Sequence, residues 1–319
     1  MRETDYAYAV ARIHANENRL LTRHDTETLL ACETAEDCLR TLSDRGYNTE
    51  LPTEEMLSAE LAKAWALVRE VAPEPDIFNV LLCKNDYHNL KAAIKGVVTG
   101  SDCYRLFVAQ GLIDPALLQA AAEARDFSAL PEEMRAPANE AMTALLETQD
   151  GQLADVILDR AALSALLAAG KASGSPFLAG YAEMIAATAD IRIALRAAHT
   201  GKSIAFLRRA LAPCGSFSVT ELADAAVQGM QAVIDFLAGT AFSGATEALS
   251  QSLSAFEKWC DDRVIESLAG AKTKPFGVEP LAAYLLGKEN EVKTVRIILS
   301  GKHNSLPDDV VRSRVRLLY

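Results

Sequence analysis

The sequence predicts an all-α protein built from three similar helical domains. Half of the 319 residues are hydrophobic and only 6% are aromatic, a composition that favours helix over sheet because alanine and leucine dominate it. Apolar residues also recur at helical spacing, as Ile191, Ala194, Leu195 and Ala198 do. Finally, similar segments recur about every 100 residues along the chain, which indicates an internal repeat.

The repeat is clearest in three twelve-residue segments, each predicted to end a long helix. They read 89-NLKAAIKGVVTG-100, 190-DIRIALRAAHTG-201 and 290-NEVKTVRIILSG-301. Each begins with Asn or Asp, carries a basic residue at its seventh position, and ends in Thr-Gly or Ser-Gly. We therefore predict that Gly100, Gly201 and Gly301 are left-handed caps that end three equivalent helices.

The Gly-Lys-Ser tripeptide that starts at Gly201 also matches the end of a phosphate-binding loop. The first glycine of such a loop would stand at position 196, which is Arg196. A bulky side chain there blocks the close backbone approach that surrounds a phosphate with amide groups. The preceding residues also have helical rather than strand periodicity, so the tripeptide is predicted to be a helix ending.

The same order of elements is predicted around each copy. A long helical stretch comes first, then a loop with proline or glycine, then the repeat helix. The long stretches are residues 54–71, 139–170 and 247–270, and the loops are residues 73–75, 173–176 and 275–280. Capped starts are predicted at Asp114-Pro115, at a Ser218-x-x-Glu221 capping box, and within residues 21–30 and 306–311. The terminal helices, about residues 4–21 and 307–319, are expected to pack together.

This order divides the chain into three helical domains, at residues 1–109, 110–212 and 213–319. Three like domains in series can either extend as a solenoid or close around an axis. Because three copies are few for a solenoid, we expect a closed, three-lobed arrangement with pseudo-threefold symmetry and a central cavity.

The charge and cysteine content exclude several classes of protein. The net charge is -11, which disfavours both nucleic acid and an anionic lipid surface as partners. The six cysteines are scattered without a Cys-x-x-Cys pair, which is typical of reduced thiols in a cytoplasmic protein. No signal peptide is recognisable, and no stretch offers 18 consecutive apolar residues, so no membrane span is predicted.

Catalytic and metal-binding constellations are also not predicted. Glu289, Glu291 and Asp86 are carboxylates without a nucleophile or third partner at a suggestive spacing. The five histidines show no metal-ligand spacing. We therefore expect no cofactor, no metal and no small-molecule substrate. Tyr104 and its neighbours follow a predicted helix cap and are expected to form a solvated loop.

Three segments of the chain resemble one known family. They are residues 5–22, residues 78–100, and residues 277–319, the last with Glu279-Pro280, Tyr284, Lys288-Glu289, Glu291 and Arg296. The middle third matches mainly through Asp190, Ile191, Arg192 and Arg196. On these residues the chain resembles the C subunit in the central stalk of V/A-type rotary ATPases, the counterpart of the d subunit of the eukaryotic V-ATPase.

The resemblance implies a specific structure and role. Members of this family are all-helical funnels of three similar domains, whose wide face rests on the cytoplasmic side of the membrane rotor ring. The cavity of the funnel receives the rotor shaft, which is made of the D and F subunits. The resemblance thus implies a non-catalytic socket, peripheral on the inner face of the membrane, that transmits torque between the shaft and the ion-translocating ring of proteolipid subunits.

Two interpretations apply to the basic residues of the repeat helices, namely Lys91, Lys95, Arg192, Arg196 and Arg296. They can form ion pairs within each domain, for example with Asp159 or Asp262 on a neighbouring helix. Alternatively, they line the cavity and meet the shaft, since arginine suits either role.

Two other functions remain open at this point. A stand-alone helical-repeat scaffold that binds soluble partners fits the repeat equally well. A nucleotide-using enzyme is suggested by Gly-Lys-Ser alone, and would lose ATP binding on Lys202→Ala.

Overall fold

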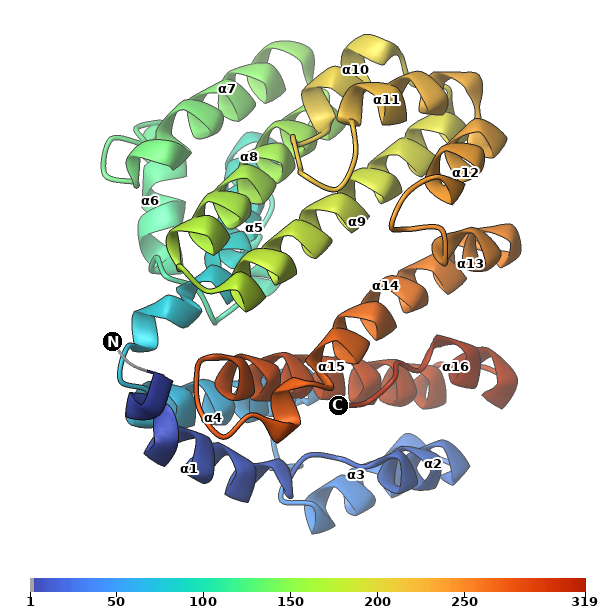
Figure 1. Cartoon of the computed structure of the whole chain (residues 1–319). Coiled ribbons are helices and arrows are strands. Elements are labelled where there is room, and N and C mark those ends of the chain that lie inside the picture. Colours follow the sequence, from blue (N-terminus) through green and yellow to red (C-terminus); the bar gives the residue numbers. More distant parts are fainter. Residues whose placement is uncertain (1–2) are drawn as a thin grey trace. The chain divides into compact units, whose positions relative to one another are not determined.

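The computed structural model describes residues 3–319, and every regular element among them is a helix (Figure 1). The all-α prediction is therefore confirmed. The described chain forms two compact units by its internal contacts. Unit 1 combines the residues up to Pro75 with Ala245–Tyr319, and unit 2 is Asp76–Gly244. The division into three domains and their arrangement as a funnel stay predictions.

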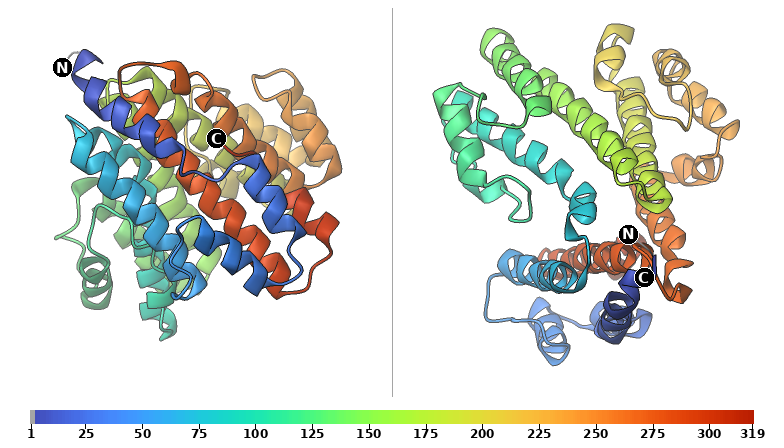
Figure 2. Two further views of the ribbon diagram at one scale, coloured as in Figure 1. Left: turned by 90° about the horizontal axis from the view of Figure 1, so that it is seen from below. Right: turned by 60° about the vertical axis from the view of Figure 1, so that its left-hand side comes forward.

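Unit 1 is built around the long C-terminal helix α15. Its helices are α1 (Ala7–Glu17), α2 (Arg23–Ala31), α3 (Ala35–Asp44), α4 (Thr53–Val71), α13 (Ala245–Gln251), α14 (Leu253–Leu268), α15 (Glu279–His303) and α16 (Asp308–Arg314), with short 3-10 turns at Glu3–Tyr6 and Ala271–Thr273. Helix α15 packs against α1, α3, α4, α14 and α16, and the left view of Figure 2 shows it alongside α1 and α4. The C-terminal residue contacts the end of α1 in this unit, since the Tyr319 hydroxyl donates to Glu17 at 3.0 Å.

Unit 2 is organised around helix α8. Its helices are α5 (Cys83–Thr99), α6 (Pro115–Ala124), α7 (Glu132–Thr148), α8 (Gly151–Ala172), α9 (Pro176–Thr200), α10 (Ile204–Ala210), α11 (Val219–Gln228) and α12 (Met230–Ala238), with 3-10 turns at Pro75–Leu81 and Tyr104–Leu106. Helix α8 packs against α5, α7, α9 and α10, as Figure 1 shows for α7 and α9. Helices α11 and α12 cover α9.

Two of the long helices expected from the sequence are each divided in two. The stretch 139–170 belongs to α7 and α8, because Gln149 adopts φ 56° and the Asp150 carboxylate caps the new helix by accepting from two backbone N–H groups. The stretch 247–270 belongs to α13 and α14, where Ser252 caps the second helix. Aspartate and serine compete for backbone hydrogen bonds, and here that competition interrupts an otherwise helical pattern.

The three repeat helices end with the same hydrogen-bonding motif, although the third ends later than predicted. Gly100 and Gly201 are left-handed caps of α5 and α9, at φ 69° and 64°. Gly301, however, lies inside α15, so its prediction as a cap is wrong. Ser305 takes the left-handed position instead, at φ 51°, and the next residue, Leu306, donates its N–H back to the Gly301 carbonyl.

Gly301 has a packing role in place of the capping role. A Cβ atom at this position would collide with the Val311 side chain of α16. The absence of a side chain therefore lets α16 lie close against α15.

The first residue of each repeat segment ties a later stretch of chain back to its long helix. The buried Asn89 amide donates to the Val108 carbonyl at 2.9 Å and accepts from the Val108 N–H at 2.8 Å. The buried Asn290 amide likewise donates to the Leu317 carbonyl. A buried polar group is costly unless it is hydrogen-bonded, so each tie fixes the position of the returning segment.

The middle copy makes this tie with a carboxyl group. Asp190 is fully buried, and its Oδ1 accepts from the Ala212 N–H at 3.0 Å. Its Oδ2 is buried without a hydrogen-bond partner. Burial raises the pKa of Asp190 to about 7, and the Ala212 N–H and Arg160 only partly oppose this rise. Asp190 therefore holds a proton at neutral pH more readily than an exposed aspartate does.

A buried carboxylate on α15 holds the N-terminal part of unit 1. Glu291 accepts from the Leu21 N–H at 2.6 Å, from the Tyr47 hydroxyl at 2.5 Å and from the Lys288 ammonium at 2.5 Å. The Lys288 ammonium also lies 3.9 Å from a Glu60 oxygen. The Lys288 and Glu291 side chains are only 6% and 2% exposed, so the pair depends on these hydrogen bonds for its stability.

We predict that Asp190→Asn stabilises the protein increasingly as the pH rises. The folded protein keeps Asp190 protonated up to about pH 7, whereas the unfolded chain ionises near pH 4. The neutral carboxyl thus contributes its full stabilisation below pH 4. As the pH rises to about 7, the free energy of unfolding falls by on the order of 2–4 kcal/mol. An amide, as at Asn89, avoids this loss.

The measurement is thermal unfolding of both proteins between pH 4 and pH 8. Asp235→Asn, at an exposed position of unit 2, is the matched control and should shift nothing with pH. An Asp190→Asn protein that is no more stable than the parent at pH 8 would show that the carboxyl is not held neutral.

We predict that Glu291→Gln destabilises the protein by roughly 3 kcal/mol, because it leaves the buried Lys288 ammonium without its closest counter-charge. Urea unfolding followed by circular dichroism measures this loss. Adding Lys288→Met should recover part of it. Glu54→Gln is the control, because it removes the exposed partner of Arg296, which lies on α15 as Glu291 does. This substitution should cost less than about 1 kcal/mol. Equal losses of stability from the two substitutions would contradict the interpretation.

Candidate functional site

The two basic residues of α5 form ion pairs with α8. The Lys91 ammonium lies 2.6 Å from Asp159, and the Lys95 ammonium lies 2.7 Å from Asp155. The sequence suggests Asp159 as a partner for the seventh repeat position, which is Lys95. The structure instead pairs Lys95 with Asp155, which lies one helical turn before Asp159 on α8. Both pairs are partly exposed, so they orient the two helices more than they stabilise them.

The basic residues of the other two repeat helices lie in different surroundings. Arg296 makes a bidentate contact with Glu54 of α4, with its Nε at 2.9 Å and its Nη2 at 2.8 Å from the two carboxylate oxygens. Its suggested partner Asp262 instead pairs with Lys258 at 3.0 Å. On α9, Arg192 is half-buried and Arg196 is exposed. The interpretation that these side chains line a cavity stays a prediction.

The Gly-Lys-Ser tripeptide joins two helices. Gly201 ends α9, and the Ser203 hydroxyl begins α10 by accepting from the Phe206 N–H at 3.2 Å. The Lys202 ammonium lies 5.3 Å from the centre of the Phe206 ring, in a cation–π contact. Each of the three residues thus has a local structural role.

A charged pocket of about 720 Å³ lies in unit 1, beside the Glu291 network. Tyr284 and Lys288, one turn apart on α15, contribute to its wall. The other charged side chains around it are Arg12, Arg19, Arg45, Lys63, Asp44, Glu60 and Glu70. Two of the residues that carry the family resemblance in α15, Tyr284 and Lys288, therefore line a pocket of mixed charge, and Lys288 also belongs to the buried Glu291 network.

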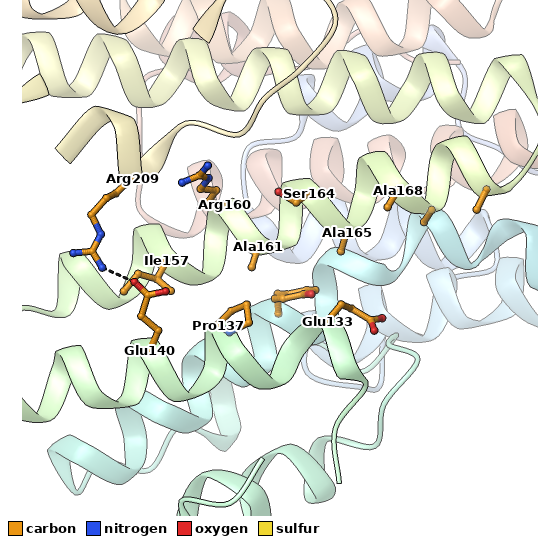
Figure 3. A pocket seen from close by; sticks show the side chains of 13 residues that line it. Glu133, Pro137, Glu140, Ile157, Arg160, Ala161, Ser164, Ala165, Ala168 and Arg209 are labelled. Atoms are coloured by element: carbon orange, nitrogen blue, oxygen red, sulfur yellow. Dashed lines mark hydrogen bonds and ion pairs between the residues drawn. The ribbon is translucent and has the colours of Figure 1, made fainter. Parts of the chain in front are cut away.

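A largely apolar groove of about 670 Å³ runs between α7 and α8 in unit 2 (Figure 3). Its α8 side is formed by small residues, namely Ala161, Ser164, Ala165, Ala168, Ala169 and Ala172. At one end, Glu140 of α7 pairs with Arg209 of α10 at 2.5 Å. Such a groove accepts an apolar side chain or a helix, and it presents Arg160 and Glu133 as charged groups beside the small residues.

An exposed apolar surface surrounds the connection from α5 to α6. Tyr104 and Leu106 are each 59% exposed, Leu112 is 45% exposed and Leu117 is 41% exposed. We call residues 100–114 the α5–α6 loop. Several large apolar side chains exposed within one short segment are typical of a contact surface, because single exposed ones are common and clusters are not.

The backbone of the α5–α6 loop is held by polar side chains on one side of α5. Asn85 donates to the Gln110 carbonyl at 2.7 Å, and Asp86 accepts from the N–H groups of Leu112 and Ile113 at 2.9 and 3.0 Å. Burial raises the pKa of the Asp86 carboxyl, while these two N–H groups oppose the rise. Tyr104 and its neighbours Asp102 and Arg105 are exposed, as expected for a solvated loop, but the backbone of the loop that follows is held in place.

Two further side chains complete this attachment. His88 Nε2 lies 2.9 Å from the Leu106 carbonyl oxygen, and Asn89 makes its paired bonds with Val108. Gly111 has no room for a side chain, because a Cβ there would lie 2.6 Å from Asp86 Oδ1. The backbone of the loop is thus fixed while its apolar side chains face solvent. The signal in the sequence is the polar run Asn85, Asp86, His88 and Asn89 at the start of a helix, ahead of an apolar segment.

The described residues contain no group of three or more His, Cys, Asp or Glu side chains arranged to hold a metal ion. Within residues 3–319, no helix combines the length and the apolar character that crossing a bilayer requires.

Comparison with known proteins gives a consistent result over nearly the whole chain. The family model described as ATP synthase (C/AC39) subunit matches residues 9–314, which include parts of both units. The C subunit of the V-type sodium ATPase of Enterococcus hirae is 28% identical over 270 residues, covering 82% of this chain and 81% of that protein.

Two further relatives match over greater lengths. The C subunit of the A-type ATP synthase of Methanothermobacter thermautotrophicus is 26% identical over 96% of this chain and 86% of its own. The C subunit of the V-type ATP synthase of Thermus thermophilus is 25% identical over 98% of both chains. With the family model spanning well over half of the sequence, the chain belongs to the family of ATP synthase C/AC39 subunits, the V/A-type family that its sequence resembles.

Proposed function

We propose that this protein is the non-catalytic central-stalk socket of a V/A-type rotary ATPase or ATP synthase. In this role it joins the shaft of the D and F subunits to the membrane rotor ring of proteolipid subunits, on the inner face of the membrane. The observation that carries the proposal is the family match across residues 9–314, because it takes in both units rather than one isolated motif. A funnel of three domains around a cavity is part of the proposal.

The internal contacts of the units suit a part that transmits torque without doing chemistry. Polar side chains on the long helices fix the returning segments at Val108, Ala212 and Leu317. Ion pairs between neighbouring helices add orientation, as at Lys91 and Asp159. Buried ties of this kind resist local opening, because breaking one leaves an unsatisfied polar group.

The exposed surfaces suit the binding of other subunits. The α5–α6 loop presents apolar side chains on a fixed backbone, so little conformational entropy is lost when a partner covers it. The α7–α8 groove offers a second apolar surface. We assign the loop to an interface with another member of the complex; the ring is the partner expected to bind through apolar contacts, since an acidic chain gains little from anionic lipid.

A stand-alone scaffold for soluble partners is the alternative. It shares the helical repeat but does not explain the match to C subunits of ATPases and ATP synthases in three organisms. Recovery of the chain free of any ATPase complex from gently lysed cells would favour it.

We predict that the complex assembled without this chain hydrolyses ATP but pumps few ions per ATP, because the shaft then lacks its connection to the ring. Ion uptake into vesicles, measured beside ATP hydrolysis, gives the ratio. Adding back the purified chain should restore coupling. Adding back the Lys202→Ala variant should restore it equally, since the Lys202 ammonium rests on the Phe206 ring within a helix connection. Full coupling without the chain would refute the socket role.

We predict that Leu106→Asp weakens assembly at least about tenfold while leaving the thermal midpoint of the isolated chain within about 1 °C. The side chain is 59% exposed, so its loss costs little folding stability, whereas a charge in an apolar contact costs several kcal/mol of binding. Leu146→Asp, at an exposed position of α7, is the matched control. Co-purification of tagged variants with the other subunits measures the effect; equal assembly of the two variants would remove the loop from the interface.

A further inference from the structure

Two cysteine thiols lie at the corner between α2 and α3. Cys32 is the residue that ends α2, and Cys38 is the fourth residue of α3. The Cys32 thiol donates to the Thr28 carbonyl at 3.4 Å, and the Cys38 thiol donates to the Leu29 carbonyl at 3.3 Å. These two carbonyls are consecutive at the end of α2, so both thiols lie at the same corner, and the Cys32 thiol contributes to the raised pKa of the Cys38 thiol.

The two thiols differ in their access to solvent. Cys38 is fully buried in the core of unit 1, whereas Cys32 is only partly buried at the edge of that core. Burial raises the pKa of Cys38 to about 12, although the nearby Lys302 ammonium opposes the rise. Cys32 is therefore the thiol that a dissolved oxidant reaches first, and the buried Cys38 thiol is the second partner of the reaction.

We propose that Cys32 and Cys38 are a redox modification site that closes to a disulfide when the protein meets a peroxide. The Cys32 thiolate attacks one oxygen of hydrogen peroxide, which breaks the O–O bond, gives Cys32 a sulfenic acid and releases hydroxide. The Cys38 sulfur then attacks the Cys32 sulfur; the S–S bond forms and the hydroxyl leaves, taking up the Cys38 proton as water. Two thiols lose two electrons, and one peroxide becomes two waters.

The position of the pair gives the disulfide a structural effect. The core that contains Cys38 also contains Val292, Val295 and Ile298 of α15. Beside it, the Lys302 ammonium of α15 donates to the Leu30 carbonyl at the end of α2 at 2.9 Å. A bond from Cys32 to Cys38 therefore fixes α2 and α3 against each other at the place where α15 rests on them.

Two other cysteines, Cys83 and Cys214, serve as controls. Cys214 is partly buried, and the groups that act on its thiol are Glu183, Asp190 and backbone N–H groups. Cys83 donates to its own local carbonyl at Val80. Within residues 3–319, no second thiol is among the groups that act on either one, so a peroxide should form no internal bridge at Cys83 or Cys214.

Mass spectrometry of the full-length chain tests the proposal directly. Trypsin releases both cysteines in a single peptide, residues 24–40, because no Lys or Arg separates them. After mild hydrogen peroxide and denaturing alkylation, we expect this peptide to be unalkylated and lighter by about 2 Da, the mass of two hydrogens. Dithiothreitol should restore the two alkylation sites. The oxidised chain should also melt about 2–4 °C higher than the reduced chain.

Variants make the result specific. Cys32→Ser should abolish the light peptide and leave Cys38 unoxidised, and Cys38→Ala should leave Cys32 as a sulfenic or sulfinic acid. Cys214→Ser should change nothing. Because Cys32 is partly exposed, Cys32→Ser is expected to fold even if the buried Cys38→Ala does not. Oxidation of Cys32 without the loss of about 2 Da, or a bridge from either residue to another cysteine, would overturn the proposal.

Discussion

The structure of both units depends on one recurring contact, a buried polar side chain on a long helix that holds a later stretch of backbone. Asn89, Asp190 and Asn290 occupy the same place in the three repeat segments, and each bonds the segment that returns after its helix has ended. An apolar residue there would bury more apolar surface but would leave the returning backbone groups without partners, at a cost of about 1–3 kcal/mol each. The tie therefore fixes the path of the chain at each return.

The repeated ties also show which features are readable in the sequence. The Asn or Asp at the start of each segment, the helical stripe and the left-handed ends at Gly100 and Gly201 all follow from local preferences, which sequence records directly. Gly301 has the same sequence signal but a different cause, since its missing side chain makes room for Val311. A glycine needed for close packing and a glycine needed for positive φ cannot be told apart without knowing what lies beside them.

Contacts between helices are less predictable than the helices themselves. Periodicity places Lys95 on a face towards a neighbouring helix, but its partner is Asp155 rather than Asp159, one turn away. A shift of one turn moves a contact by about 5.4 Å along the axis without changing which face is buried. The firm attachment of the α5–α6 loop escapes sequence reasoning for a related reason: its polar anchors lie many residues before the backbone they hold, and only the fold brings Asp86 to Leu112.

The three segments differ most in what the tie holds. In the middle copy Asp190 bonds Ala212, and the Leu211 and Ala212 side chains are buried. In the first copy Asn89 bonds Val108, yet the neighbouring Leu106 is 59% exposed. The same contact thus holds a buried segment at Ala212 and an exposed apolar segment at Val108. If all three segments only closed a core, the apolar residues of the first would be expected inside; their exposure on a firmly held backbone is better explained by a surface kept ready for a partner.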